Sequence, residues 1–398
     1  MKILAICQHY WPEPYPLTDI LEELVKRGHS VDLITDFPNY PMGELYPNYK
    51  LCNRYEECHN GVHIIRTFTI PRKHNAIFRL LNYYSYSISS TIFAKSLPGN
   101  YDVVFTNQTS PVMMSRAAFA YAKKYHKKSV MYCMDLWPAC LAAGGVPDTS
   151  SIYKFFGKVS KKLYNKADHI LITSRMFKDY LVQQHDVDPS RIEYFPQYAT
   201  SQFNIAEGNA NDKETIDLMF AGNIGAAQSL ITVLDAAELL KENTKLYFHI
   251  IGDGSELEHL KKIANDKNLD HVIFYGRKPV EKMAEYYAKA DAMLVTLTAD
   301  PFISLTLPGK VQTYMASGKP IIGAAIGEIP NVIKEADCGY CANAEDAKGL
   351  AEAITKFIHN SNKKKLGLNA RSYYEKHFTK EMFMANLEHV LYEYSMND

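Results

Sequence analysis

The sequence contains 398 residues, of which 47% are hydrophobic, and its 44 Lys and Arg residues balance 44 Asp and Glu residues. This length predicts two domains rather than one core. The zero charge balance excludes a general attraction to nucleic acid, so any attraction to a charged surface must be local.

Targeting, membrane and metal signals are weak in this sequence. No apolar run approaches the ~20 residues of a membrane-spanning helix, and the segment Met1–Ile6 is too short for the core of a signal peptide. We therefore expect a cytoplasmic protein. The seven cysteines are scattered, and Cys338 and Cys341 form a CxxC pair with no second pair at zinc-finger spacing. Reduced thiols fit this pattern, and we expect no metal site.

The first half alternates strand and helix patterns. A strand at Lys2–Cys7, an amphipathic helix at Thr18–Lys26 that ends at Gly28, and a strand at Ser30–Thr35 form a βαβ unit with parallel pairing. The alternation then continues with strands at 62–66, 103–107, 129–134 and 170–173, and with helices at 77–96, 115–125 and 154–166. This pattern predicts an open, doubly wound sheet.

The second half repeats the alternation after a polar, Asn-rich linker at Gln202–Thr215. Strands are predicted at 218–221, 247–252, 272–275 and 292–296, and helices at 229–241, 257–267, 280–289, 347–359, 369–377 and 380–394. We expect two Rossmann-like α/β domains, at 1–200 and 215–378, that face a cleft. We expect the helix in 379–398 to pack back on the N-terminal domain.

Loops at strand ends in the second half carry the candidate ligand-binding residues. The first loop contains Gly222, Asn223, Gly225 and Gln228, where glycines allow close backbone approach and a helix start attracts anions. The second contains Gly252, for which a purely structural turn is the alternative. In the third, Gly276 could cradle a flat base and Arg277 could approach a phosphate, although a solvated loop is the alternative.

The segment Leu305–Gly323 is the most specific of these loops. Pro308 fits the first turn of a helix, Gly309 lets the chain pass close to a ligand, and Lys310 adds a cation at the same helix start. Unpaired N–H groups, the helix dipole and an ammonium group together predict a diphosphate site. Gly318 ends this helix before the next strand.

Three residues at strand ends in the first half are candidates for acceptor binding. Asp135 could orient an acceptor hydroxyl, or it could cap a helix. Trp137 could stack on a sugar face, or it could belong to an interdomain core. His9 follows the first strand and is expected to form hydrogen bonds rather than to act as a base.

The chain resembles family-4 glycosyltransferases of the GT-B fold almost from end to end. The resemblance is carried by the segments Arg27–His29, Gly222–Gln228, Gly252–Gly254 and Tyr314–Pro320, together with Gly276. Within that family, Asp135–Pro138 and Pro308–Lys310 resemble the subgroup that builds bacterial O-antigen and capsule repeats, which includes N-acetylfucosaminyl transferases. The resemblance implies a nucleotide-sugar donor, retention of anomeric configuration and no essential metal.

Several positions depart from the family pattern. Many members carry two glutamates eight residues apart near the donor, and here Leu305 and Thr313 stand at those places. Many also carry Arg and Lys after the first donor-side strand, where this chain has Asn223 and Gln228. Lys310 then has more charge to neutralise, and Glu328 could replace a lost carboxylate.

The resemblance also implies a sugar on polyprenyl diphosphate as the acceptor. Basic residues around Arg72 and an aromatic-rich helix that includes Tyr86 suit peripheral contact with the inner membrane, although such a stripe can also be core. We therefore expect transfer from a UDP-sugar, without a cofactor, by front-face attack in which the departing diphosphate accepts the proton. A non-catalytic nucleotide-sugar scaffold and a UDP-sugar epimerase of related fold are the alternatives.

Overall fold

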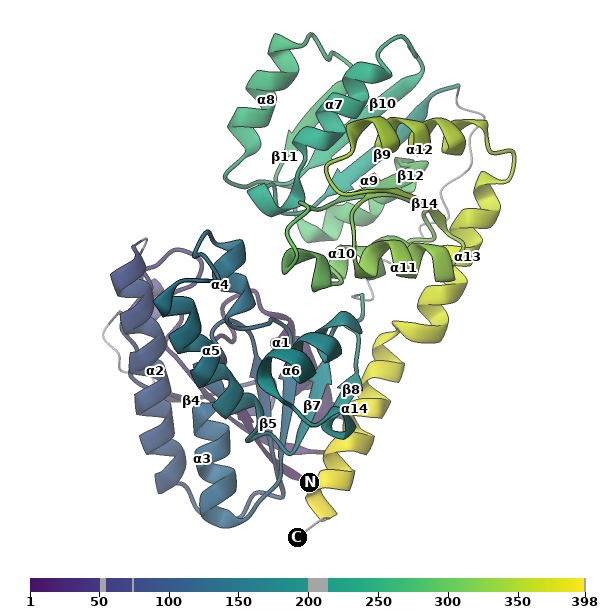
Figure 1. Cartoon of the computed structure of the whole chain (residues 1–398). Helices are drawn as coiled ribbons and strands as arrows, with labels where there is room; N and C mark the ends of the chain where they lie inside the picture. The colour runs from purple at the N-terminus through teal and green to yellow at the C-terminus, as the bar shows by residue number, and fades with distance from the viewer. Residues whose placement is uncertain (51–54, 74, 200–213, 397–398) are drawn as a thin grey trace. The chain divides into compact units, whose positions relative to one another are not determined.

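The protein is described here from a computed structural model covering residues 1–50, 55–73, 75–199 and 214–396 (Figure 1). The chain divides into two compact units, Met1–Phe195 with Met384–Asp398, and Pro196–Phe383. The sequence predicted borders at residues 200, 215 and 378. Most of the predicted linker, residues 202–213, lies outside the described residues, as does His74 in the predicted membrane-contacting stretch.

Within the described residues, the first unit holds an eight-stranded sheet of order β3-β4-β2-β1-β5-β6-β7-β8. All neighbouring strands are parallel except the antiparallel pair β3–β4. The strands are β1 (Lys2–Ile6), β2 (Ser30–Thr35), β3 (Glu56–His59), β4 (Val62–Arg66), β5 (Val103–Gln108), β6 (Ser129–Cys133), β7 (His169–Ile172) and β8 (Ile192–Tyr194).

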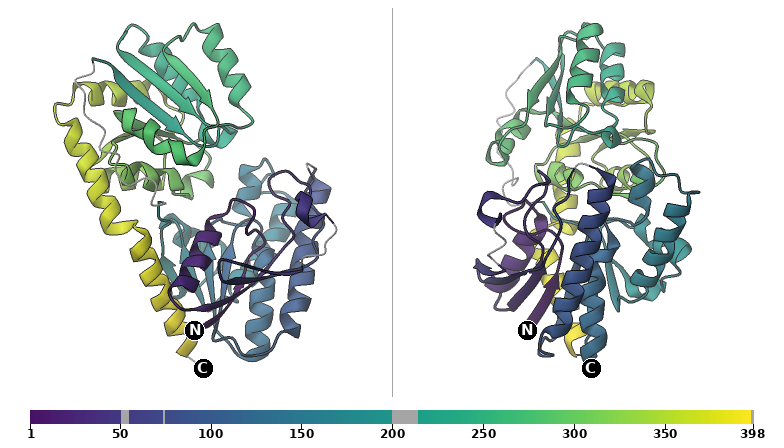
Figure 2. Two further views of the ribbon diagram at one scale, coloured as in Figure 1. Left: turned by 180° about the vertical axis from the view of Figure 1, so that it is seen from behind. Right: turned by 90° about the vertical axis from the view of Figure 1, so that its left-hand side faces the viewer.

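Helices cover both faces of this sheet, so its central strands are buried. The helices are α1 (Pro16–Lys26), α2 (Ala76–Ser96), α3 (Arg116–Tyr125), α4 (Ala139–Ala143), α5 (Ser151–Tyr164) and α6 (Met176–His185). All six residues of β5 are buried, as expected for a strand covered on two faces. Figure 2 shows α1 on the face of the sheet opposite to α2 and α3.

The described part of the second unit holds a six-stranded parallel sheet of order β11-β10-β9-β12-β13-β14. Its strands are β9 (Ile216–Ala221), β10 (Leu246–Ile251), β11 (Val272–Gly276), β12 (Ala292–Thr296), β13 (Ile321–Ala324) and β14 (Gly339–Ala342). Its helices are α7 (Ile231–Leu239), α8 (Leu257–Asp266), α9 (Met283–Lys289), α10 (Gly309–Ala316), α11 (Glu328–Glu335), α12 (Ala347–His359) and α13 (Lys363–His377). The predicted class, two Rossmann-like α/β domains, is confirmed.

The last helix, α14 (Lys380–Met396), begins in the second unit and belongs to the first unit from Met384 onward. Its Glu388 carboxylate accepts hydrogen bonds from Arg27 Nη1 at 2.9 Å and lies 2.8 Å from His29 Nε2. Its Tyr394 hydroxyl lies 3.1 Å from His169 Nδ1. Polar contacts with residues from two distant parts of the first-unit sequence thus hold α14 in place.

Several elements differ from the sequence-based prediction, which did not include α4, α6, α11, β3, β8 or β14 and began α13 too late. The strand β3 was missed although Asn60 and Gly61, with φ of 47° and 85°, form the left-handed turn that an Asn-Gly pair favours. Helix α13 starts six residues before the predicted Asn369. The predicted start is late because Gly367 weakens the helical pattern, whereas in the structure Gly367 lies within the helix and packs against the Gly318 carbonyl. Helix α11 was not predicted because it contains Pro330, which the first turn of a helix tolerates.

None of the helices in the described ranges combines the length and apolarity needed to cross a bilayer.

Candidate functional site

Three loops at the carboxyl ends of β9, β10 and β11 lie against one another. Gly222 N donates to the Ile251 carbonyl at 3.0 Å, and Gly252 N donates to the Gly276 carbonyl at 3.1 Å. A Cβ atom at Gly252, whose φ is 147°, would lie 1.8 Å from the Gly222 carbonyl oxygen. The predicted need for glycine in these loops therefore has a specific cause, which is the close approach of one loop backbone to the next.

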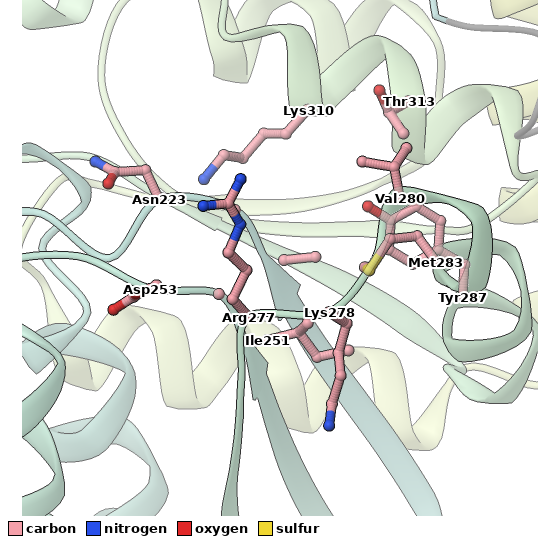
Figure 3. A pocket seen from close by; sticks show the side chains of 13 residues that line it. Asn223, Ile251, Asp253, Arg277, Lys278, Val280, Met283, Tyr287, Lys310 and Thr313 are labelled. Atoms are coloured by element: carbon pink, nitrogen blue, oxygen red, sulfur yellow. The ribbon is translucent and has the colours of Figure 1, made fainter. Parts of the chain in front are cut away.

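A pocket of about 470 Å³ opens beside these loops, entirely within the second unit. Five of the predicted donor-binding residues line it, namely Gly222, Asn223, Gly252, Arg277 and Thr313, together with Lys310, which was predicted to be catalytic. Its apolar wall is formed by Ile251, Val280, Met283 and Tyr287, which the sequence analysis did not single out. The pocket thus has a cationic side and an apolar side (Figure 3).

Lys310 provides the cationic side from the first turn of α10. Its ammonium nitrogen is buried and makes no hydrogen bond within the described part of the chain. The nitrogen lies 3.9 Å from the centroid of the Phe220 ring, and burial lowers the pKa of Lys310 to about 7. A buried cation without an anionic partner is a costly arrangement that an anion would relieve.

Backbone and side-chain groups around Lys310 also favour an anionic ligand. A Cβ atom at Gly222 would lie 3.1 Å from the lysine nitrogen, so glycine there leaves room for the ammonium group. The guanidinium of Arg277 points toward Lys310, whereas the Lys278 side chain points away from it (Figure 3). The start of α10 adds the unpaired N–H groups that every helix presents at its N-terminus.

Tyr314 fixes the position of this helix start, and sequence reasoning missed it. Its hydroxyl donates to the Ala221 carbonyl at 2.9 Å and accepts from Ala221 N at 3.0 Å. Because Tyr314 follows Lys310 by four residues, both side chains lie on one face of α10. The signal available in the sequence is a tyrosine on the same face of a short helix as Lys310.

Several predicted donor-side residues take structural positions instead. Gln228 and Gly225 do not line the pocket, because the Gln228 side-chain oxygen accepts from Gly225 N and from Asn223 Nδ2, each at 3.2 Å. Pro308 is the N-cap of α10 rather than part of its first turn, so Gly309 begins the helix. Gly276 ends β11 with a φ of 66° and is not among the residues that line the pocket.

Glu328 does not replace the lost carboxylate in this pocket. It is the first residue of α11, is 1% exposed and is absent from the pocket lining. The preceding Gly327 is the N-cap of this helix and has a φ of 83°. The expectation that Glu328 contacts the donor is therefore corrected.

The strand ends of the first unit carry a buried polar network. His9 Nδ1 lies 2.9 Å from Glu13 Oε2, and the other Glu13 oxygen accepts from the backbone N–H groups of Asn39 and Tyr40, both at 2.7 Å. Burial, together with the nearby Glu13 charge, raises the pKa of Asp36 to about 8. His9, Glu13 and Asp36 bring potential metal-ligand atoms within 4.8 Å, but internal hydrogen bonds already account for their positions.

Asp135 and Trp137 follow β6 but occupy different environments. Burial raises the pKa of Asp135, whose carboxylate accepts from Ser110 Oγ at 3.3 Å. Trp137 is 2% exposed, and its ring meets Tyr83 and Phe156 edge to face. The predicted role of Trp137 as a sugar-stacking platform is corrected, because the ring packs inside the first unit.

Comparison with known proteins identifies the families that the two halves of the chain match. Residues 17–197 match the model for Glycosyltransferase Family 4, and residues 201–373 match the model for Glycosyl transferases group 1. The chain is a glycosyltransferase. The two matched regions correspond to the two units, and the pocket around Lys310 lies in the group 1 region.

Relatives and solved structures agree with this assignment. WbjE of Pseudomonas aeruginosa, named as a glycosyltransferase, is 28% identical over 64% of this chain and 65% of its own length, which is just under two thirds. WcaI of Escherichia coli K12, named for colanic acid biosynthesis, is 24% identical over 96% of this chain and 97% of its own. The structure of HepE from Anabaena with UDP and glucose has a TM-score of 0.69 at 14% identity, covering 98% of this chain and 99% of HepE, and shows that the glycosyltransferase has the GT-B fold.

We predict that Gly252→Ala destabilises the glycosyltransferase strongly, because a Cβ atom would lie 1.8 Å from a backbone oxygen that cannot easily move. Urea unfolding should show a loss larger than the roughly 1 kcal/mol of an ordinary glycine substitution. Gly157→Ala in α5, where nothing lies within 4 Å, is the matched control and should be neutral or slightly stabilising. Equal stability of the two variants would contradict the proposed loop contact.

We predict that Lys310→Met stabilises the unliganded protein at pH 6, because it removes a buried charge. The pKa of Lys310 is lower in the folded chain, about 7, than the ordinary 10.5. Between these values the unfolded chain binds more protons, so wild-type stability rises with pH. The advantage of the variant should be up to about 5 kcal/mol at pH 6 and should decline toward pH 10.5, as followed by urea unfolding. A difference independent of pH would argue that the lysine is not desolvated.

Proposed function

We propose that the protein transfers a sugar from a UDP-sugar to a saccharide carried on polyprenyl diphosphate, with retention of configuration, in bacterial surface polysaccharide synthesis. The donor sugar we favour is an N-acetylated deoxyhexosamine. The reaction would need no cofactor and would take place in the cytoplasm, at the inner face of the membrane. The observation that carries the proposal is the buried ammonium group of Lys310, which has no hydrogen-bonding partner in the described chain and borders a pocket.

The pocket supports a nucleoside diphosphate better than a neutral sugar. A diphosphate would place its charge between Lys310 and Arg277, close to the N–H groups at the start of α10. The apolar wall that includes Val280 and Met283 offers a flat base a surface away from water. The solved complexes of HepE with UDP and with UDP-glucose, which share this fold, make a uridine nucleotide the natural first choice.

Catalysis would rest on stabilising the leaving group. Charge develops on the diphosphate as the sugar departs, and a fixed cation in a desolvated site stabilises that charge strongly. The departing diphosphate would accept the proton of the attacking hydroxyl on the same face of the sugar. We assign Asp135 to orient the acceptor hydroxyl, because its carboxylate follows β6 and can accept a hydrogen bond from a hydroxyl group, as it does from Ser110 Oγ at 3.3 Å.

We predict that Lys310→Ala lowers the rate of sugar transfer by about 2–4 kcal/mol in activation free energy, as for one lost charge-stabilising donor. Initial rates with a UDP-sugar and a lipid-linked acceptor measure this change. Lys278→Ala is the matched control, because it removes a lysine from the same pocket whose side chain points away from Lys310. Equal rates for both variants would refute the role of Lys310.

We also predict that UDP binding takes up a proton near pH 8. The free Lys310 ammonium, with a pKa near 7, is mostly neutral at that pH, and a bound diphosphate raises the pKa by attraction. Affinity should therefore fall as the pH rises through 7 to 9. Calorimetry in two buffers of different ionisation enthalpy measures the uptake, which should disappear in Lys310→Met.

The main alternative is a protein that binds nucleotide-sugars without transferring them. It is kept open by Leu305, Asn223 and Gln228, which stand where many relatives carry charged donor-side residues. UDP binding without transfer to any lipid-linked acceptor would favour this scaffold. Interconversion of UDP-sugars without an acceptor would instead favour an epimerase.

A further inference from the structure

Helix α2 (Ala76–Ser96) partly reverses the usual placement of polar and apolar residues, because its buried face holds polar residues beside Tyr83, Tyr86 and Ala94 while large apolar residues are exposed. Its buried positions include Asn82, Ser87 and Ser90, whereas the apolar Ile77, Ile88 and Ile92 are 70%, 51% and 67% exposed. Surface helices normally turn their apolar stripe toward the core. A helix with this reversal is expected to meet a second apolar environment on its outer face.

The buried polar groups of α2 are satisfied, so the reversal is built into the fold. Asn82 Nδ2 donates to the Ile70 carbonyl at 2.8 Å, and Asn82 Oδ1 accepts from Gln8 Nε2 at 2.7 Å. Ser87 Oγ donates to the Met113 carbonyl at 3.0 Å. These bonds fix which face of the helix points outward.

The exposed apolar residues of α2 form one continuous stripe. Ile77, Leu81, Ile88 and Ile92 follow one another at spacings of four, seven and four residues, which places them on one helix face. Beside the last of them opens an apolar groove of about 540 Å³, whose wall includes Ile92 and the 60% exposed Phe68. The stripe therefore runs along most of α2 and ends at this groove.

The chain segment that carries this stripe contains basic but no acidic residues, although Glu56 of β3 lies in the wall of the groove. No Asp or Glu occurs between Glu57 and Asp102, although the whole chain is balanced, and Arg72, Lys73, Arg79 and Lys95 lie in that segment. A second copy of the chain that bound here through the same face would bring these cations together, which opposes self-association. An anionic surface would be attracted to them.

Helix α5 extends the same kind of surface. The Trp137 ring contacts Tyr83 of α2 and Phe156 of α5, so the two helices are neighbours around this side chain. Near this contact, Ile152 and Phe155 at the start of α5 are 60% and 55% exposed. The helix contains four lysines and no acidic residue.

We propose that the apolar stripe of α2, continued by the first turns of α5, lies in the headgroup region of an anionic bilayer. The inference rests on the proposed function, in which the acceptor is carried in a membrane. It also redraws the contact predicted from the sequence around Arg72–Tyr86, because Tyr83 and Tyr86 are buried and the exposed stripe continues to Ile92. Apolar insertion and attraction of basic residues would act together, as in interfacial amphipathic helices.

Flotation of the full chain with vesicles of equal parts phosphatidylcholine and phosphatidylglycerol tests the proposal. The double variant Ile88→Asp/Ile92→Asp should bind these vesicles at least roughly tenfold more weakly than wild type, since two apolar anchors become anionic. Leu239→Asp/Leu368→Asp is the matched control, because those side chains are 59% and 69% exposed on helices of the second unit. The control should bind like wild type, and pure phosphatidylcholine vesicles should bind all proteins weakly.

Each outcome decides the matter. Equal vesicle binding by the double variant and wild type, or no vesicle binding by wild type, overturns the proposal. A wild-type protein that binds no vesicles but forms a dimer in sedimentation, which the double variant does not form, also overturns it. If the double variant is misfolded by thermal unfolding, Arg79→Glu/Lys95→Glu replaces it and should lose binding to the anionic vesicles. Calorimetry with UDP tests the proposed donor site separately from the proposed membrane contact. If the wild-type protein does not bind UDP, the donor site is refuted, whereas the flotation result is unaffected.

Discussion

The second unit is organised around one electrostatic constraint, the buried ammonium group of Lys310. Desolvation makes this charge unfavourable in the empty protein, and the aromatic ring of Phe220 offsets only part of that cost. The surrounding structure holds the group in place, since Tyr314 ties α10 to the end of β9 and the glycines of three loops leave space beside it. Stability is thereby exchanged for a site in which the lysine is already held in place before a ligand arrives.

The charged side chains at the strand ends of the two units differ in whether they have hydrogen-bonding partners inside the protein. In the first unit, the carboxylates of Glu13 and Asp36 are enclosed in a network of internal hydrogen bonds, and His9 belongs to that network. In the second unit, the cation of Lys310 has no such internal partner in the described chain. An enclosed network favours a rigid scaffold, whereas an unmatched charge favours binding. This contrast agrees with a donor site in the later half of the chain.

The sequence predicted the fold well, because alternating apolar strands and amphipathic helices leave few other architectures. It also brought together much of the pocket, since glycines after strands and a lysine at a helix start have direct physical meaning. It failed where a residue's role depends on packing from distant segments. Trp137 is enclosed by Tyr83 and Phe156, and Glu328 is buried at the start of α11, and neither arrangement leaves a local signal. The partly reversed faces of α2 were hidden for the same reason, because periodicity gives the stripe but not the side on which the core lies.

The path of the chain also determines how the molecule can be divided. The second unit is one uninterrupted segment, Pro196–Phe383, whereas the first unit is assembled from the beginning of the chain and its last residues. A truncation after Phe195 would therefore strip the first unit of α14 and leave Arg27, His29 and His169 without Glu388 and Tyr394. In topological terms the second unit is an insertion within the first. Ribosomal synthesis must then deliver α14, after the whole second unit, before the earlier unit can be completed.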